Sequence, residues 1–293
     1  MTGTNSVELV ECPRDAMQGL HHYIPAEMKV EYLNQLLRAG FNTLDFGSFV
    51  SPKAIPQLRD TAEVLAKLDR GASSTSLLAI VANERGAKEA LSFSEIDFLG
   101  FPFSISETFQ RRNTNSSIAE SLITVQNMQN LCLQHNRQLV VYISMAFGNP
   151  YNDPWEPALA LEWSTRIAEM GVQTIALADT VGIASESVVS ALFKELIPSL
   201  PKVKVGAHLH CTPYNWEGKL QAAWDAGCRR FDSAIRGFGG CPMAEDELVG
   251  NLATENLLAF LDKKEVSHSV NREEFTKSWN MAAAVFSPEA ATS

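Results

Sequence analysis

The stretch V-K-V-G-A-H-L-H at residues 203–210 is a short apolar run that ends in two histidines. Its length and its β-branched residues are typical of a buried β-strand. Because side chains alternate between the faces of a strand, His208 and His210 would point to the same side at its carboxyl end. That spacing suits a metal site, although a histidine pair at a strand end can also cap a core or face the solvent. The stretch predicts a strand and leaves both interpretations of its histidines open.

Similar apolar runs recur along the chain and alternate with stretches of helical periodicity. The expected strands are residues 7–12, 43–46, 77–82, 96–101, 139–145, 174–178, 203–208 and 231–235. The clearest expected helices are residues 26–39, 55–68, 116–135, 159–170, 185–196 and 216–226. Gly40, Gly171 and Gly227 stand where helices would end. About eight strand–helix units predict a parallel sheet closed into a (β/α)8 barrel, a TIM barrel, with a doubly wound open sheet as the alternative.

No low-complexity linker divides the chain, so residues 1–293 are expected to form a single barrel domain. The proline-containing patch at 149–154 is expected to be a long loop that follows a strand. Residues 262–293 are expected to form a C-terminal helical extension, because they become charged and then contain a helix-like stretch at 273–285.

Composition and charge exclude several classes of function. The formal net charge is -10 and the basic residues form no block, which disfavours a nucleic-acid surface. No apolar run is long enough to span a membrane, and the first expected strand leaves no room for a targeting peptide. The 5 cysteines are odd in number and widely spread, which argues against a disulfide framework. We therefore expect a cytoplasmic protein with no nucleic-acid or membrane partner.

Polar residues gather where the expected strands end. Arg14 and Asp15 follow the first strand, Asp45 ends the second, Asp179 follows the sixth, and the two histidines end the seventh. The carboxyl ends of the strands carry the active site in TIM-barrel enzymes. Each residue alone has a structural explanation, such as a surface ion pair or a helix cap. Their gathering on one rim favours a functional site.

The last expected strand is followed by R-G-F-G-G-C-P at 236–242 and then by Gly250 and Asn251. Three glycines around an aromatic residue allow the backbone to swing or to approach a ligand closely, and Cys241 lies at the tip. We interpret this segment as a lid over the site, although a tight structural turn would use two of the same glycines.

Six phrases of the sequence resemble the 3-hydroxy-3-methylglutaryl-CoA lyase family. They are P-R-D-A-M-Q at 13–18, S-F-V-S-P-K-A-I-P-Q at 48–57, L-A-D-T-V-G at 177–182, H-L-H at 208–210, G-F-G-G-C-P at 237–242 and G-N-L-A-T-E at 250–255. They occur in the family's order over nearly the whole chain. The resemblance implies a TIM barrel from a wider group of metal-dependent lyases and Claisen-type synthases, in a family that is commonly dimeric, so a homodimer is expected.

The resemblance assigns four residues to a metal site. Asp15, His208, His210 and Asn251 match the family positions that bind one divalent cation. Oxygen and imidazole ligands that leave room for substrate oxygens suit Mg²⁺ or Mn²⁺ better than a closed structural zinc site. The substrate would be 3-hydroxy-3-methylglutaryl-CoA, held through its tertiary hydroxyl and its free carboxylate.

The resemblance also implies catalytic roles. Loss of the hydroxyl proton would let the carbon–carbon bond break in a retro-Claisen sense, which releases acetoacetate and an acetyl-CoA enolate. Arg14 would stabilise the enolate oxygen, and Cys241 would protonate the carbanion as a neutral thiol. Asp179 and Asp45 are candidates for the general base. Asp45 stands where the family usually has a glutamate, and its shorter side chain leaves its role open.

Further residues are expected to bind the substrate. Gln18, Ser48 and Tyr142 are candidates for contacts with the acyl-CoA. Residues 106–113 resemble a loop that the family uses for the CoA end. Arg111 and Arg112 in this loop would meet phosphate groups, unless they are merely solvated.

The chain departs from the family at a few positions. Cys211 replaces a carboxylate that the family has after its histidine pair, and the first strand runs into E-C-P-R-D, one residue shorter than usual. Two alternatives to the lyase are a Claisen-type condensing acyltransferase for a 2-oxo acid and acetyl-CoA, and a non-catalytic barrel that binds acyl-CoA. Cys241 and the complete set of metal-binding residues favour the lyase.

Overall fold

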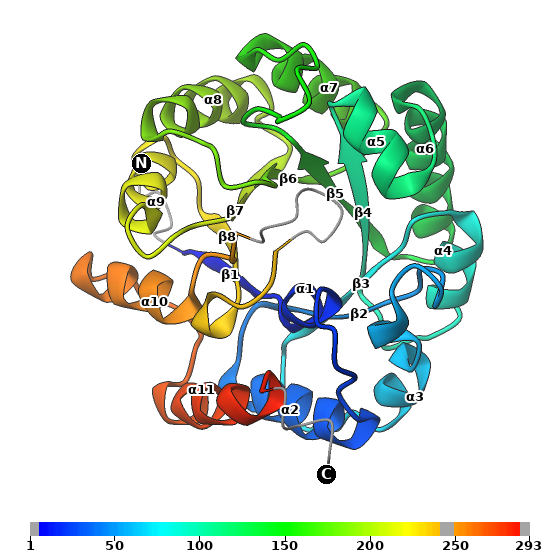
Figure 1. The fold of residues 1–293 in the computed structure, drawn as a ribbon, viewed down its shortest axis with the longest axis vertical. Coiled ribbons are helices and arrows are strands. Elements are labelled where there is room, and N and C mark those ends of the chain that lie inside the picture. Colours follow the sequence, from blue (N-terminus) through cyan, green and yellow to red (C-terminus); the bar gives the residue numbers. More distant parts are fainter. Residues whose placement is uncertain (1–5, 241–248, 288–293) are drawn as a thin grey trace.

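Parallel strands close into a barrel at the centre of the molecule (Figure 1). The structure is a computed structural model that describes residues 6–240 and 249–287. The strands are β1 (Glu8–Glu11), β2 (Thr43–Ser48), β3 (Ser76–Ile80), β4 (Phe98–Ser104), β5 (Gln138–Ser144), β6 (Thr174–Asp179), β7 (Lys204–Leu209) and β8 (Arg230–Ser233). They pair in sequence order, and β8 returns beside β1, where Glu8 lies opposite Arg230. The predicted TIM barrel is confirmed, and the open sheet is excluded.

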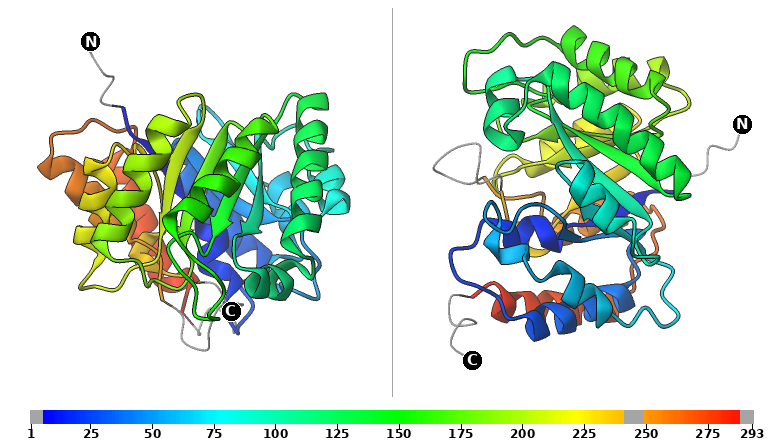
Figure 2. Two further views of the ribbon diagram at one scale, coloured as in Figure 1. Left: turned by 90° about the horizontal axis from the view of Figure 1, so that it is seen from above. Right: turned by 90° about the vertical axis from the view of Figure 1, so that its right-hand side faces the viewer.

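Helices surround the barrel and run alongside its strands, and a short one, α1 (Pro13–Gln18), lies at the barrel mouth (Figures 1 and 2). They are α1 (Pro13–Gln18), α2 (Ala26–Ala39), α3 (Thr61–Ala66), α4 (Glu84–Ala90), α5 (Glu107–Thr114), α6 (Ile118–Gln134), α7 (Pro157–Glu169), α8 (Glu186–Ser199), α9 (Trp216–Asp225), α10 (Thr254–Lys263) and α11 (Arg272–Val285). Gly40, Gly171 and Gly227 follow α2, α7 and α9 with φ values of 81°, 91° and 97°. The predicted helix ends are therefore formed by left-handed glycines.

Two predictions about helices are wrong. The single helix expected at 55–68 is divided into a 3₁₀ turn (Pro56–Leu58) and α3. Asp60 lies between the two parts, and its carboxylate accepts hydrogen bonds from the buried amine of Lys29 and from Tyr23. The loop expected at 106–113 is largely the helix α5, because the Ser106 hydroxyl caps it by accepting from the backbone N–H of Phe109.

The loop predicted at 149–154 is confirmed, and it supports α5. The Asp153 carboxylate in this loop accepts hydrogen bonds from the Ser106 hydroxyl, at 2.6 Å, and from the backbone N–H and hydroxyl of Thr108. These bonds fix the start of α5 against the loop that follows β5. The position of α5 matters because its last turn reaches the mouth of the barrel.

An apolar cluster lies inside the barrel, separate from the core between strands and helices. It consists of Leu78, Ile80, Val140, Tyr142 and Ala176. Its members on β3 and β5 are two residues apart, so they share the inward face of their strands. The rest of the interior carries buried charged residues, such as the ion pair between Arg230 and Asp232. These charged residues lie beneath the functional site.

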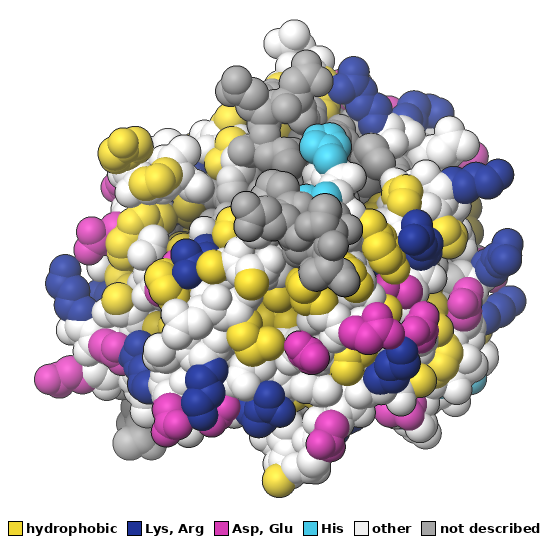
Figure 3. Space-filling model, turned by 60° about the horizontal axis from the view of Figure 1, so that its bottom comes forward, with side chains coloured by type: hydrophobic (Ala, Val, Ile, Leu, Met, Phe, Trp, Pro, Cys, Tyr) yellow, Lys and Arg dark blue, Asp and Glu magenta, His cyan; other side chains and the backbone are white. Residues whose placement is uncertain are grey.

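The helix predicted at 273–285 is confirmed as α11, which packs against α2 (Figure 1). The Gln35 amide donates to the Glu274 carboxylate, and Tyr32 meets Phe286 edge to face. Figure 3 shows both acidic and basic side chains on one face of the molecule. Within the described part of the chain, no helix is long and apolar enough to cross a membrane.

Candidate active site

A cavity of about 440 Å³ opens at the carboxyl ends of the barrel strands. Its polar wall comes from α1 and from the end of β7, and its apolar wall comes from β3, β4, β5 and the loop after β2. The residues that line it and bear on function are Arg14, Asp15, Gln18, Ile80, Phe109, Arg112, Tyr142, His208 and His210. The strand ends at which the sequence predicted a functional site therefore surround a cavity.

Asp15, His208 and His210 form a compact group of ligand atoms in this cavity. Each offers one such atom, and the three atoms lie within 4.8 Å of one another. The Nδ1 atom of His210 is buried and has no hydrogen-bond partner among residues 6–240 and 249–287. Burial and the nearby charge of His208 lower the pKa of His210 to about 4, so its imidazole is neutral and ready to act as a ligand. These residues therefore fit a divalent cation with oxygen and nitrogen ligands.

Asn251 lies beside this group, although it is far away in the sequence. Its backbone forms an antiparallel bridge with His210, and its amide donates to the Asp15 carboxylate at 2.7 Å and to the carbonyl of Phe238. The four expected metal-binding residues are thus brought together.

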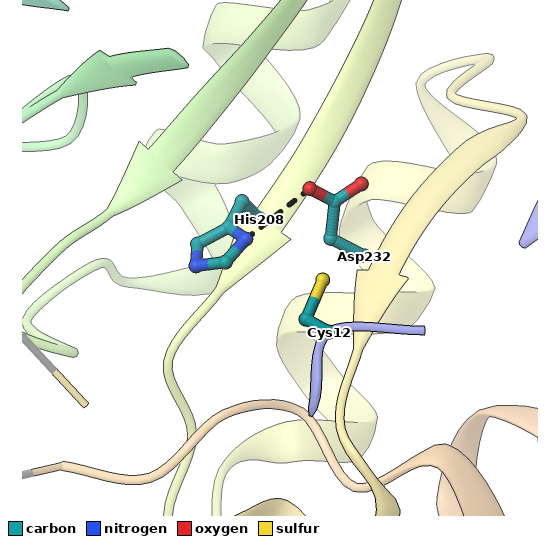
Figure 4. A group of neighbouring side chains, drawn as sticks. All are labelled: Cys12, His208 and Asp232. Carbon is teal, nitrogen blue, oxygen red and sulfur yellow. Dashed lines mark hydrogen bonds and ion pairs between the residues drawn. The ribbon is translucent and has the colours of Figure 1, made fainter. Parts of the chain in front are cut away.

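Asp232 supports His208 from inside the barrel. The Nδ1 atom of His208 lies 3.2 Å from the Asp232 carboxylate, and Cys12 lies close to both residues (Figure 4). Burial acts to lower the pKa of His208, but the hydrogen bond to Asp232 and the charge of Asp15 outweigh it and raise the pKa. A carboxylate behind a ligating histidine fixes the orientation of its ring. Because Nδ1 of His208 faces Asp232, its Nε2 atom is left to bind a cation together with Asp15 and His210.

Arg14 is held by acidic and amide side chains around it. Its guanidinium donates to Asp45 through Nε, at 3.0 and 3.1 Å, and through one terminal nitrogen. Its other terminal nitrogen donates to Asp15 and to Gln18. The Gln18 amide in turn donates to Asp15. Arg14 is therefore oriented at the wall of the cavity before a substrate binds, as an electrostatic catalyst requires.

The two candidate bases lie beneath the cavity lining. Burial raises the pKa of Asp45 to about 6 in spite of its ion pair with Arg14. The Asp179 carboxylate accepts a hydrogen bond of 2.6 Å from the buried amine of Lys219 and another from the backbone N–H of Ala184. Neither aspartate is among the residues that line the cavity. Instead, the Asp45 carboxylate is paired with Arg14, and the Asp179 carboxylate is paired with Lys219.

The expected substrate-binding residues divide into two groups. Gln18, Tyr142 and Arg112 line the cavity, and the guanidinium of Arg112 lies 4.7 Å from the ring centre of Tyr151. Ser48 lies in the barrel wall instead, where its hydroxyl donates to the carbonyl of Ile80. Arg111 points to solvent and pairs with Glu107, one turn earlier in α5, at 2.7 Å. Cys241, the expected acid, lies outside the described residues.

Sequence reasoning missed Asp232 and Lys219. Asp232 is buried with the rest of β8, and a buried acidic residue needs a partner. The signal in the sequence is an acidic residue within a predicted buried strand. Lys219 is hidden in an amphipathic helix, α9, where a lysine is ordinarily solvated. Its amine is instead buried and donates to Asp179, to the carbonyl of Gly182 and to the carbonyl of His210. It thereby ties the ends of β6 and β7 together.

Comparisons with known proteins agree with this geometry. A model of the HMGL-like family matches residues 7–281. A hydroxymethylglutaryl-CoA lyase of Bacillus subtilis is 32% identical over 262 residues, which cover 89% of this chain and 87% of that protein. A 3-hydroxy-3-isohexenylglutaryl-CoA/hydroxy-methylglutaryl-CoA lyase of Pseudomonas aeruginosa is 30% identical over 280 residues, which cover 95% of this chain and 92% of that protein.

A solved structure matches over almost its whole length. It is an HMG-CoA lyase from Acinetobacter baumannii in complex with coenzyme A and 3-methylmalate, with a TM-score of 0.89 at 27% identity, and the match covers 99% of this chain and 96% of that one. The family match, the two relatives and this structure agree with the barrel and with the residues gathered at its mouth. The chain therefore belongs to the HMGL-like family, as an enzyme of the hydroxymethylglutaryl-CoA lyases.

Proposed function

We propose that this protein cleaves 3-hydroxy-3-methylglutaryl-CoA to acetyl-CoA and acetoacetate and that it needs a divalent cation, Mg²⁺ or Mn²⁺. The observation that carries the proposal is the group of Asp15, His208 and His210 at one cavity with Arg14, in a chain of this lyase family. The relatives at 30% and 32% identity are lyases, so a condensing acyltransferase and a non-catalytic barrel are not favoured.

Asp15, His208, His210 and Asn251 would hold the cation. A bound divalent cation would lower the cost of removing the proton from the tertiary hydroxyl of the substrate. Arg14 would donate hydrogen bonds to the thioester oxygen as its enolate develops, because its guanidinium is already aimed at the cavity. Cys241 would give its proton to the terminal carbon of that enolate, as the resemblance implies.

The acyl-CoA would lie along the cavity with its CoA end toward α5. Arg112 is the cation placed to meet a phosphate there, since Arg111 is paired with Glu107 at the surface. Gln18 and Tyr142 would contact the acyl group, because both line the cavity near the proposed metal ligands. The structure of the relative with bound coenzyme A supports this class of substrate.

The test is the release of acetoacetate from 3-hydroxy-3-methylglutaryl-CoA by the purified protein. We expect turnover with Mg²⁺ or Mn²⁺, none after chelation, and a fall of at least about a hundredfold in Cys241→Ala, as for a lost general acid. His210→Ala should lose metal binding, and its melting temperature is the check on folding, since the Nδ1 atom of His210 has no hydrogen-bond partner in the part of the chain that the structure describes. A folded, metal-loaded wild type that releases no acetoacetate would overturn the proposal.

A cytoplasmic location, a homodimer and a single-domain organisation stay predictions from the sequence. Cell fractionation would test the first, and sedimentation of the purified protein the second. Limited proteolysis would test the third, because a single domain that includes α11 should resist cleavage between α10 and α11.

A further inference from the structure

A second group of candidate metal ligands lies deeper in the barrel and shares His208 with the first. Cys12 directly follows β1, His208 lies on β7 and Asp232 lies on β8. Each offers one ligand atom, and the three atoms lie within 4.8 Å of one another. Figure 4 shows the thiol and the carboxylate near one edge of the imidazole, while the other ring nitrogen points away from Asp232. Three separate elements therefore converge on one point.

The ligand types differ between the two groups. The first offers carboxylate oxygen and imidazole, whereas the second adds a thiol, which as a thiolate favours Zn²⁺, Cd²⁺ or Co²⁺ over Mg²⁺. The Nδ1 atom of His208 lies 3.2 Å from the nearer Asp232 oxygen. Two ligands of one tetrahedral zinc ion lie about 3.3 Å apart, given bonds of about 2.0–2.1 Å. A zinc ion would therefore replace the hydrogen bond between the two side chains without moving the two atoms far apart.

The surroundings of Cys12 also favour a cation. Burial raises the pKa of the Cys12 thiol most, and the nearby carboxylates of Asp232, Asp45 and Asp15 raise it further. A cation that replaces the thiol proton would offset this negative charge. Arg230 neutralises part of this charge, but it binds one oxygen of Asp232, at 2.7 Å, and leaves the other facing His208. His208 lines the cavity, and Cys12 and Asp232 are buried behind it, so a cation would have to enter past the ring of His208.

We propose that Cys12, His208 and Asp232 form a second metal site, for a thiophilic divalent cation such as Zn²⁺, and that its occupation excludes a cation from the first site. A neutral imidazole has one nitrogen lone pair and one N–H. A cation on Nδ1 of His208 leaves the proton on Nε2, so the ring is lost as a ligand to the first group. Binding releases the thiol proton of Cys12 to solvent, and the imidazole proton of His208 moves from Nδ1, where it faces Asp232, to Nε2. One S–H bond and one N–H bond break, and one N–H bond forms. If the proposed lyase function holds, a cation in the second site would stop turnover, and this consequence rests on the proposed function. Binding of the cation to the second site does not depend on that function.

Cobalt is the probe that tests binding without turnover, because a thiolate ligand gives Co²⁺ an intense charge-transfer absorption in the near ultraviolet. The spectra of the wild type, Cys12→Ala and the matched control Cys211→Ala are compared on titration with Co²⁺. Cys211 is also buried and follows His210 directly. We expect the band in the wild type and in Cys211→Ala, and its loss in Cys12→Ala. A missing band in the wild type, or an unchanged band in Cys12→Ala, overturns the second site.

Competition between two cations tests the exclusion of the first site. Free Mn²⁺, detected by electron paramagnetic resonance, should rise when Zn²⁺ is added to the Mn²⁺-loaded wild type. Cys12→Ser, which keeps the size of the side chain, should need at least about tenfold more Zn²⁺ for the same release, since even the loss of a supporting group costs tenfold or more. Equal Zn²⁺ requirements in both proteins overturn the exclusion. A cobalt band in a wild type that never releases acetoacetate would reject the proposed lyase function and leave the second site standing.

Discussion

The guanidinium of Arg14 on α1 binds the carboxylate of Asp45 on β2 through Nε and a terminal nitrogen, inside the barrel. The side chains of both residues are almost completely buried, and 31 positions separate them in the sequence. The pair leaves the other terminal nitrogen of Arg14 directed at Asp15 and Gln18. Asp45, which the sequence offers as a base, therefore holds the guanidinium of Arg14, the proposed catalytic arginine, in its orientation.

Asp45→Asn should lower kcat for acetoacetate release by about 10²-fold, because a catalytic group displaced by about 1 Å can lose that much. Asp45→Glu keeps the charge and should lose less. Steady-state kinetics of the two variants and the wild type are the measurement, with melting temperature as the check on folding. Equal kcat values in all three proteins would mean that Asp45 neither orients Arg14 nor acts as the base.

A double-mutant cycle on Asp179 and Lys219 separates structure from catalysis. Lys219→Met should destabilise the protein by about 3–5 kcal/mol, because it leaves the Asp179 carboxylate buried without its cation. Adding Asp179→Asn should restore part of that loss, which denaturant unfolding would measure. The double variant should still release acetoacetate if Asp179 is an anchor, and it should be inactive if Asp179 is the general base.

Asp232→Asn should weaken the binding of Mn²⁺ by about 10–100-fold, since a carboxylate behind a ligating histidine contributes about that much. Titration calorimetry with Mn²⁺ is the measurement. Asp225→Asn, an exposed change at the end of α9, is the control and should bind Mn²⁺ like the wild type. An unchanged affinity in Asp232→Asn would show that Asp232 does not support the metal ligand.

The neighbours Arg111 and Arg112 provide a matched pair of variants. Arg112→Gln should raise the KM for the acyl-CoA several-fold and leave kcat nearly unchanged, because it removes a contact that substrate and transition state share. Arg111→Gln should leave both constants unchanged, since its side chain pairs with Glu107 away from the cavity. The proposed phosphate contact would be refuted by a KM that rises in Arg111→Gln instead.

Glu11 should make the stability of the protein depend on pH. Burial raises the pKa of its carboxyl from 4.5 to about 8, although the hydroxyl of Thr254 and the backbone N–H of Ile235 both donate to it. Between these pH values the folded protein holds a proton that the unfolded chain has lost. The free energy of unfolding should therefore fall as pH rises from 4.5 to 8, by up to about 1.4 kcal/mol per pH unit.

Melting temperatures of the wild type and of Glu11→Gln between pH 5 and pH 8 would test this dependence. The variant cannot ionise at this position, so its melting temperature relative to the wild type should be higher at pH 8 than at pH 5. Glu31→Gln, an exposed change on α2, should follow the wild type at every pH. Parallel curves for Glu11→Gln and the wild type would show that Glu11 is ionised in the folded protein.

The sequence by itself determined the barrel and the rim on which the site lies. Alternation of strands and helices specifies a parallel sheet, because each strand must return in the same direction after a helix. The spacing of His208 and His210 specifies that both face one side, since side chains on a strand alternate. Both are local regularities, and the chain records them directly. The strand-end pattern also offered Arg14 and Asp15, the resemblance added Asn251, and the structure brings all three to the same rim.

Only the tertiary structure decided which charged groups pair. Asp232 reaches His208 across 24 positions and Lys219 reaches Asp179 across 40, in each case because neighbouring elements are brought together when the barrel closes. Adjacent residues on a helix point in different directions, so only one of Arg111 and Arg112 can face the cavity. The packing of α5 against the barrel decides that it is Arg112, while Arg111 lies in solvent. Such choices depend on three-dimensional neighbours and on burial, which no local pattern in the sequence encodes.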